Sequence, residues 1–163
     1  MSDIYPLREF ESVSLAIMPR PRAGDWLEDE VSSWQRAGIR TVVSLLEAQE
    51  ISELGLGDES RLCSVHGIDF ISFPIPDRGV PTSHGALNQL VLPLVPKVKS
   101  GHMVAVHCRA GIGRSGVVAA GILLRAGVPY PQVFPALSRA RGVAVPDTDA
   151  QAEWVQAYAR SDL

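Results

Sequence analysis

The chain has 163 residues, enough for a substantial hydrophobic core, and we expect residues 1–163 to form a single domain. Its hydrophobic content of 46% and charged content of 20% are ordinary for a soluble globular protein. A formal net charge of −3 argues against general binding to nucleic acid or to a membrane surface. Residues 1–10 lack a secretory signal pattern, and the two cysteines lack the spacing of a disulfide framework, so we expect a cytoplasmic location.

Hydrophobic periods and breakers predict strands that alternate with helices, the pattern of an α/β fold with a central, mostly parallel sheet flanked by helices. The predicted strands span residues 12–18, 39–46, 68–75 and 102–107. The predicted helices span residues 25–37, 48–54, 58–66, 83–99, 115–126, 131–141 and 147–160. Trp26 is expected on the buried face of the first helix, and Pro93 and Pro96 are expected to distort the helix over 83–99. Asp147 or Thr148 is expected to cap the last helix.

The most informative segment, residues 107–116, reads His-Cys-Arg-Ala-Gly-Ile-Gly-Arg-Ser-Gly and joins a predicted strand to a predicted helix. We call it the cysteine loop. Backbone N–H groups in such a tight loop form a concave anion site, and the helix N-terminus behind it adds partial positive charge. Cys108 would be a thiolate at neutral pH in this setting, and Arg114 could hold two oxygens of a phosphoryl group. A nucleophile and an anion clamp in one loop indicate phosphoryl transfer to sulfur and then to water.

A second segment, residues 74–81, reads Pro-Ile-Pro-Asp-Arg-Gly-Val-Pro, and we call it the aspartate loop. Its Asp77 lies 31 residues before Cys108. Ester hydrolysis needs an acid because the leaving oxygen departs more easily once it is protonated. The same letters are also ordinary turn chemistry. Ligands bind at the carboxyl ends of the strands in open α/β sheets, so we expect the two loops to meet there.

The cysteine loop resembles the His-Cys-x-x-Gly-x-x-Arg-Ser signature, the P-loop, of the cysteine-based protein-tyrosine and dual-specificity phosphatases. The fixed positions of that signature are occupied by His107, Cys108, Gly111, Arg114 and Ser115. The aspartate loop resembles the acid loop of the same enzymes, although it reads Ile-Pro-Asp where the large tyrosine-specific members read Trp-Pro-Asp. Rhodanese-like sulfurtransferases also hold a cysteine in an anion-binding loop, but they lack the Gly-x-x-Arg-Ser ending. The resemblance implies a small, single-domain phosphatase fold.

The resemblance also implies catalytic roles. Cys108 would be the nucleophile, Arg114 the phosphoryl clamp and Asp77 the general acid. Ser115 would donate a hydrogen bond to the cysteine sulfur, although a serine there could instead cap a helix. Gln151 would orient the water that attacks the phosphocysteine, although it could also be a solvated helix residue.

Supporting and substrate-binding roles follow from the same resemblance. His107 would be a buried support for the thiolate, and Glu50 would brace the P-loop arginine, although a surface charge on a helix is the competing interpretation. Cys63 could form a protective disulfide with Cys108 or be a spare cysteine in the core. The residues expected to bind substrate are Arg109, Ala110, Gly111, Ile112, Gly113 and Arg114.

The expected activity is hydrolysis of phosphotyrosine in a phosphoprotein, with phosphoserine and phosphothreonine as further candidate substrates, through a phosphocysteine. The alternatives are a phosphatase of phosphoinositides or other small phosphorylated metabolites, and a non-catalytic phosphate-binding module. Lipid phosphatases place basic residues at two variable P-loop positions, whereas here one is Arg109 and the other is Ile112. Silent relatives usually lose the cysteine, the arginine or the acid, and all three are present. We expect a monomer without metal, cofactor, nucleic-acid partner or membrane attachment.

Overall fold

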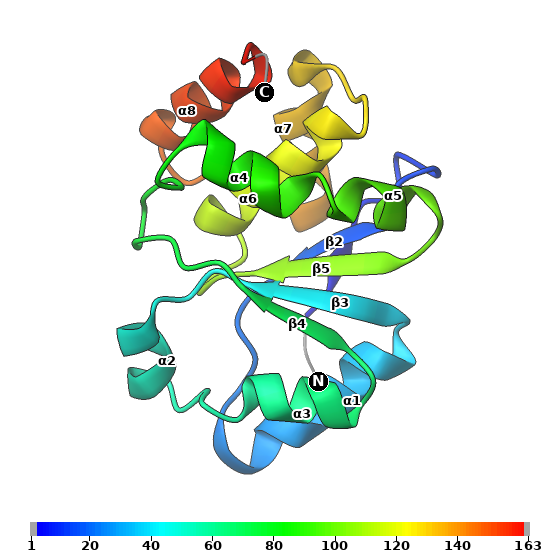
Figure 1. The fold of residues 1–163 in the computed structure, drawn as a ribbon, viewed down its shortest axis with the longest axis vertical. Coiled ribbons are helices and arrows are strands. Elements are labelled where there is room, and N and C mark those ends of the chain that lie inside the picture. The colour runs from blue at the N-terminus through cyan, green and yellow to red at the C-terminus, as the bar shows by residue number, and fades with distance from the viewer. Residues whose placement is uncertain (1–2, 162–163) are drawn as a thin grey trace.

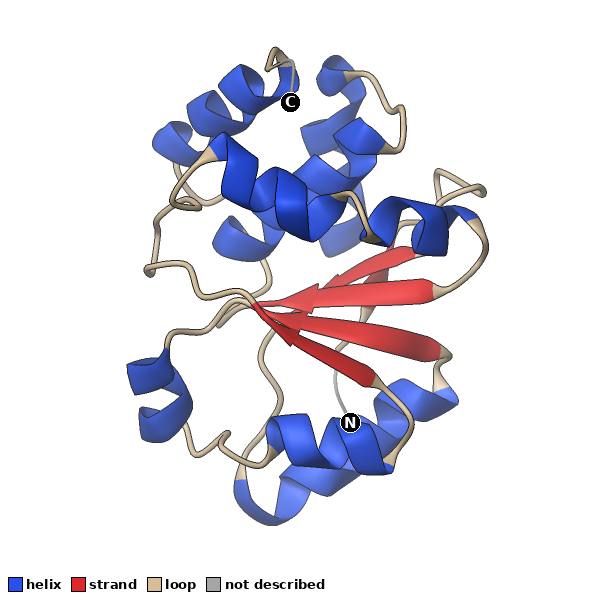
Figure 2. Ribbon diagram, viewed as in Figure 1, coloured by secondary structure: helices blue, strands red, loops and turns tan. Residues whose placement is uncertain are grey.

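The computed structural model describes residues 3–161 and shows a five-stranded sheet between two layers of helices (Figures 1 and 2). The strands are β1 (Tyr5–Pro6), β2 (Leu15–Met18), β3 (Ile39–Ser44), β4 (Asp69–Ser72) and β5 (Met103–His107). Their order across the sheet is β1-β2-β5-β3-β4. Strands β2, β5, β3 and β4 are parallel, and only the short β1 pairs antiparallel to its neighbour. The expected α/β fold with a mostly parallel central sheet is confirmed.

Helices cover both faces of this sheet. One layer holds the 3-10 turn η1 (Gly24–Trp26) with α1 (Leu27–Arg36) and α3 (Glu59–Val65). The other layer holds α4 (His84–Val91), α5 (Leu94–Lys99), α6 (Gly113–Arg125), α7 (Tyr130–Arg141) and α8 (Asp149–Ala159). Helix α2 (Ala48–Glu53) lies beyond the carboxyl ends of the strands, at the lower left of Figure 1. No helix within residues 3–161 combines the length and apolar character needed to cross a bilayer.

The central strand β5 is buried from Val104 onward, because it has helices on both sides. Val104 and Val106 pack into the core beneath α4–α8, whereas Ala105 packs into the core beneath α1 and α3. Successive side chains of a strand point to opposite faces. The alternation continues past the end of the strand, so that His107 faces the α1/α3 layer and Cys108 faces the α6 side.

Two expectations about local structure are wrong. The single helix expected over residues 83–99 is two helices, since α4 ends at Val91 and α5 begins at Leu94; the distortion expected at Pro93 is present as this break, whereas Pro96 lies inside α5. Pro93 lacks the N–H that a continuous helix would use, and its ring clashes with the preceding turn. Trp26, expected in the core, is 57% exposed because it ends the 3-10 turn, and the guanidinium of Arg22 lies 4.6 Å from its ring centre.

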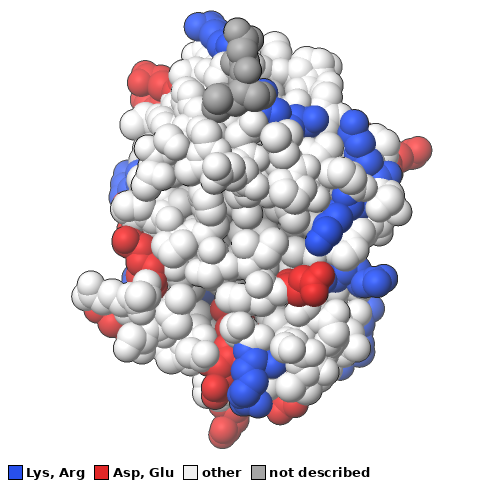
Figure 3. Space-filling model, viewed as in Figure 1, with Lys and Arg blue, Asp and Glu red and all other residues white. Residues whose placement is uncertain are grey.

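The surface beside the aspartate loop is uncharged. Residues 79–96 contain no Asp, Glu, Lys or Arg, and Figure 3 shows a broad area without charged side chains over α4. Leu92, just after α4, is the most exposed large apolar residue of this segment at 50%. The face next to the loop is therefore uncharged, with Thr82, Ser83 and Gln89 exposed beside Leu92.

Candidate active site

The cysteine loop and the aspartate loop meet beyond the carboxyl ends of β5 and β4, where they line a cavity of about 90 Å³. The residues that line it are Asp77, Arg78, Cys108, Arg109, Ala110, Ile112, Gly113, Arg114, Asp147 and Gln151. The structure thus brings together site residues expected from three distant segments. Arg78 and Asp147 were not singled out as site residues from the sequence.

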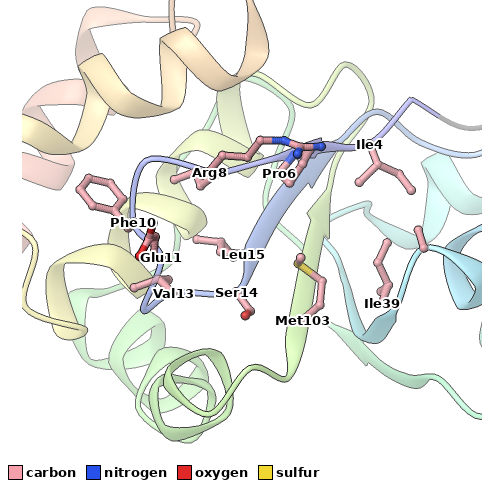
Figure 4. Close-up of a pocket in the computed structure, with 12 residues that line it drawn as sticks. Ile4, Pro6, Arg8, Phe10, Glu11, Val13, Ser14, Leu15, Ile39 and Met103 are labelled. Atoms are coloured by element: carbon pink, nitrogen blue, oxygen red, sulfur yellow. The ribbon is translucent and has the colours of Figure 1, made fainter.

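A larger cavity of about 530 Å³ lies at the opposite, amino-terminal ends of the strands, where β2, β3 and β5 begin. Figure 4 shows Leu15, Ile39 and Met103 pointing into it, with Arg8 and Glu11 among the lining residues. Neither a cysteine nor a histidine lines this cavity. The smaller cavity is therefore the one with a nucleophile. Within residues 3–161, no group of three His, Cys, Asp or Glu side chains is placed to hold a metal ion.

The cysteine loop is held tightly from outside. Gly111 has φ of +72°, and a Cβ there would lie 2.6 Å from the carbonyl carbon of Met18 at the end of β2, so a larger residue does not fit. The guanidinium of Arg141 on α7 donates to the carbonyl of Ala110 at 3.1 Å. A trans peptide points its N–H opposite to its C=O. The carbonyl of Arg109 likewise accepts from the backbone N–H of Arg20, so the N–H groups of Ala110 and Gly111 point away from these outer partners.

Ser115 lies inside α6, not at its cap. The helix begins at Gly113 with Ile112 at the N-cap position, so the helix-cap interpretation of Ser115 is wrong. Ser115 is fully buried, and its hydroxyl has no hydrogen-bond partner among the described residues. A buried hydroxyl normally finds a partner. This one is free to donate to a group in the cysteine loop.

Arg114 is 2% exposed and is clamped by Glu50 of α2. Its Nη1 donates to Glu50 Oε2 at 2.8 Å, and its Nη2 donates to Oε1 at 2.9 Å. Nη1 also donates to the carbonyl of Ile75 at 2.9 Å. Glu50 is only 7% exposed, so its interpretation as a surface charge is wrong.

These contacts determine which N–H groups of the Arg114 guanidinium remain available to bind a ligand. Glu50 takes the edge formed by Nη1 and Nη2, and Ile75 takes the other Nη1 hydrogen. Within the described residues, the edge formed by Nε and Nη2 donates no hydrogen bond to protein, and its nearest carboxylate is Asp77 Oδ1 at 3.5 Å. A guanidinium edge with two parallel N–H groups matches two oxygens of a phosphoryl group.

The electrostatics of the clamp favour the charged forms of both partners. The hydrogen bonds from Arg114 hold the pKa of Glu50 below its ordinary value, against the opposing effect of burial. Burial alone would lower the pKa of Arg114, but the hydrogen bonds to Glu50 and the charges of Cys108, Glu50 and Asp77 raise it overall. Arg109 also lies near this pair, with its Nε 3.3 Å from Glu50 Oε1.

Glu50→Gln is expected to lower the free energy of unfolding at pH 7 by up to about 3 kcal/mol, because breaking a buried ion pair leaves one charge uncompensated. Glu53→Gln, an exposed change on the same helix, is the matched control and should alter stability by less than about 0.5 kcal/mol. Since the pKa of Glu50 is lowered, its stabilisation is present above the ordinary value of 4.5 and is lost as pH falls through the lowered value. Urea unfolding from pH 7 to well below pH 4.5 measures this loss. A stability difference that grew toward acid pH would contradict the clamp.

His107 is fully buried and pairs with Glu59, a carboxylate not predicted from the sequence to belong to the site. Its Nε2 lies 2.6 Å from Oε2 of Glu59 on α3, and its Nδ1 lies 3.3 Å from the carbonyl oxygen of Cys108. Glu59 is 2% exposed and shares the buried face of α3 with Leu62 and Cys63. The sequence did carry a signal for the burial of Glu59. Glu59 lies three positions before Leu62 and four before Cys63, so it shares their face of the helix.

Gln151 is also fully buried, so the solvated-helix interpretation is wrong. Thr148 is the N-cap of α8, which settles the choice between Asp147 and Thr148. The Gln151 side chain accepts from the Thr148 N–H at 3.2 Å and donates to the carbonyl of Gly79 in the aspartate loop at 3.0 Å.

Cys63 and Cys108 are both free thiols in the structure. They pack in the two different cores, on opposite faces of the sheet. Burial, with a smaller contribution from the charge of Glu59, raises the pKa of Cys63 to about 12. The structure therefore does not bring the two sulfurs together, and it fits the interpretation of Cys63 as a spare core cysteine.

The sequence of this chain matches a protein-family model and is similar to those of known proteins. A family model described as "Tc-R-P: Polymorphic toxin system, DSP-PTPase phosphatase" matches residues 16–128, more than half of the chain. Cyclin-dependent kinase inhibitor 3 of Rattus norvegicus is 29% identical over 98 residues, which cover 60% of this chain and 46% of that protein. Laforin of Mus musculus is 36% identical over 63 residues, which cover 39% of this chain and 19% of that protein. The chain thus aligns with less than half the length of these two relatives.

Solved structures share the fold over nearly the whole chain. Kinase associated phosphatase, with its catalytic-site cysteine replaced by serine, gives a TM-score of 0.83 at 20% identity and covers 97% of this chain and 93% of its own. Tk-PTP in its active form gives a TM-score of 0.75 at 26% identity and covers 92% of this chain and 94% of its own. Taken with the match over residues 16–128, these similarities show that the chain belongs to the DSP-PTPase phosphatase family, a family of hydrolases.

Proposed function

We propose that this chain, acting as one phosphatase domain over residues 1–163, hydrolyses phosphotyrosine in phosphoproteins through a phosphocysteine on Cys108. The observation that carries the proposal is the content of the small cavity. It holds a cysteine, a guanidinium with a free two-donor edge and an exposed carboxylate, which can serve as the nucleophile, the phosphoryl clamp and the acid.

In the first step, the thiolate of Cys108 attacks phosphorus and forms the P–S bond. The bond from phosphorus to the ester oxygen breaks, its electron pair goes to that oxygen, and Asp77 supplies the proton. The free edge of Arg114 binds two of the equatorial oxygens as charge spreads over them. The side chain of Asp77 is 64% exposed, so it faces the entrance, where the leaving group departs.

In the second step, water attacks phosphorus and the P–S bond breaks. The electron pair returns to sulfur, the proton of the water goes to the carboxylate of Asp77, and inorganic phosphate leaves. The hydroxyl of Ser115, buried without a partner, is the donor we assign to the departing sulfur. His107, oriented by Glu59, supports the first carbonyl of the loop from the opposite face of the sheet.

Substrate preference follows from the walls of the cavity. Ile112 supplies an apolar surface for a ring, and the uncharged face over α4 adjoins the aspartate loop. Arg78 and Arg109 place further positive charge in its lining. Aryl esters also have a better leaving group than alkyl esters, which lowers the barrier of the first step. The enzyme acts as a cytoplasmic monomer without metal or cofactor.

The test is phosphate release from matched peptides that carry phosphotyrosine, phosphoserine or phosphothreonine, with phosphoinositides and inositol phosphates beside them. Phosphotyrosine is expected to give the highest kcat/KM. A tenfold preference for phosphothreonine or a phosphoinositide, about 1.4 kcal/mol in transition-state free energy, would overturn the substrate assignment while leaving the mechanism in place. Release from none of them, with phosphate still bound, would favour the non-catalytic binding module.

A further inference from the structure

The side chain of Gln151 touches three segments that come together only in the folded chain. Its Oε1 accepts from the backbone N–H of Thr148, and its own backbone N–H donates to the Thr148 hydroxyl at 3.1 Å, which closes a capping box at the start of α8. Its Nε2 donates to the carbonyl of Gly79. A Cβ built on Gly113 would lie 3.1 Å from both Gln151 amide atoms, so the amide lies directly against the start of α6.

The aspartate loop has few other attachments. Between Pro76 and Val80, the hydrogen bond from Gln151 to Gly79 is the one hydrogen bond that joins the loop to another part of the described chain. The N–H of Gly79 donates to Pro76 within the loop, and Arg78 holds a left-handed φ of +61°, which is unfavourable for a residue with a Cβ. A strained, exposed loop keeps one conformation only when its surroundings hold it.

The capping box fixes the direction in which the amide donates. An Asn or Gln amide has one accepting oxygen and one donating nitrogen. Because Oε1 accepts from Thr148, Nε2 is turned toward Gly79, two residues after Asp77. The start of α8 is therefore coupled to the position of the loop carboxylate.

We infer that Gln151 is a positioning residue that latches the aspartate loop over Cys108, so that Asp77 is in place to protonate the leaving group. The inference rests on the proposed role of Asp77 as the acid. It differs from the expectation that Gln151 orients the hydrolytic water, because the amide oxygen and one amide hydrogen already have protein partners. The two roles act on different steps, and kinetics separate them.

Two variants separate the latch from the cap. Gln151→Met keeps the approximate side-chain volume and removes both side-chain hydrogen bonds, the one accepted from Thr148 and the one donated to Gly79. Gln151→Glu keeps the oxygen that accepts from Thr148 but cannot donate to Gly79, and Glu is a favoured residue at this position of a capping box. Thr148→Ala is the matched control, because it weakens the cap and leaves the Gln151–Gly79 bond in place. Asp77→Asn provides the reference for lost acid catalysis.

The measurement is kcat/KM for aryl phosphates with good and poor leaving groups, together with a pre-steady-state burst assay. For Gln151→Met and Gln151→Glu we expect kcat/KM to fall about tenfold for poor leaving groups, a partial form of the loss expected for Asp77→Asn, and to change little for good ones. No burst should appear. Thr148→Ala should lower the melting temperature without changing the dependence on leaving group.

A lower kcat with unchanged kcat/KM and a burst would show that the phosphocysteine accumulates, and would assign Gln151 to the water instead. An equal loss for all leaving groups would also overturn the latch. Amide hydrogen exchange gives a readout that needs no activity: exchange at Gly79 and Val80 should speed up in Gln151→Met and stay unchanged in Thr148→Ala. Unchanged exchange in Gln151→Met overturns the inference, whereas an inactive wild-type protein overturns only the proposed function.

Discussion

Cys108→Ser is expected to abolish turnover while leaving oxyanion binding intact. A serine hydroxyl attacks phosphorus only if a base removes its proton, whereas cysteine is intrinsically the stronger nucleophile. The neighbouring His107 cannot serve as that base, because its ring faces the α1/α3 layer and pairs with Glu59. The loop amides and Arg114 are unchanged, so the anion site remains.

Phosphate release and tungstate binding by calorimetry measure the two halves of this prediction. Cys63→Ala is the matched control, because Cys63 lies in the other core and should be dispensable for catalysis. Vanadate should inhibit the wild type competitively. Residual turnover in Cys108→Ser, or wild-type activity that a chelator removes, would rule out the phosphocysteine mechanism.

Arg114→Lys is expected to be far from conservative. Lysine has three N–H donors at one point, whereas the guanidinium uses one edge on Glu50, another hydrogen on Ile75 and still offers a free edge. An ammonium group that keeps its contact with Glu50 cannot also present two parallel donors to a phosphoryl group. We expect kcat/KM to fall about 10²-fold or more, the scale for losing a transition-state donor.

The loss should appear in both kinetic constants, since the clamp acts on bound substrate and on the transition state. Steady-state kinetics on an aryl phosphate, with circular dichroism to confirm folding, make the measurement. Arg125→Lys, on the same helix but bonded to Asn88 and Tyr158, controls for the chemistry of the substitution. Wild-type kinetics in a folded Arg114→Lys protein would contradict the assignment.

Local patterns were sufficient to predict the sheet and the two loops. The alternation of strand and helix periods placed all four parallel strands to within a few residues, because each pattern is set by neighbours along the chain. The cysteine loop is a continuous signature, so proximity along the chain brings six of its residues to one cavity, namely Cys108, Arg109, Ala110, Ile112, Gly113 and Arg114. The short β1 was missed because two residues carry no detectable period.

The partners of the site residues could not be predicted in the same way. Glu59 lies 48 residues from His107, and Gly79 lies 72 residues from Gln151, and only tertiary packing brings them into contact. The contact of Glu50 with Arg114, suggested by resemblance, spans 64 residues. The broken helix at Pro93 was a local event, but the sequence alone left open whether the proline bends the helix or ends it.

The orientation of Arg114 depends on α2, a very short helix that carries Glu50. It has six residues, and a helix of this length is not stable alone in water. Glu50 closes the capping box of α2 with Glu47 and also accepts hydrogen bonds from Arg114. Local opening of α2 therefore removes the contact that orients the guanidinium of Arg114. Heat should therefore inactivate the enzyme reversibly while the sheet is still folded, and the temperature of maximal rate should lie below the melting temperature.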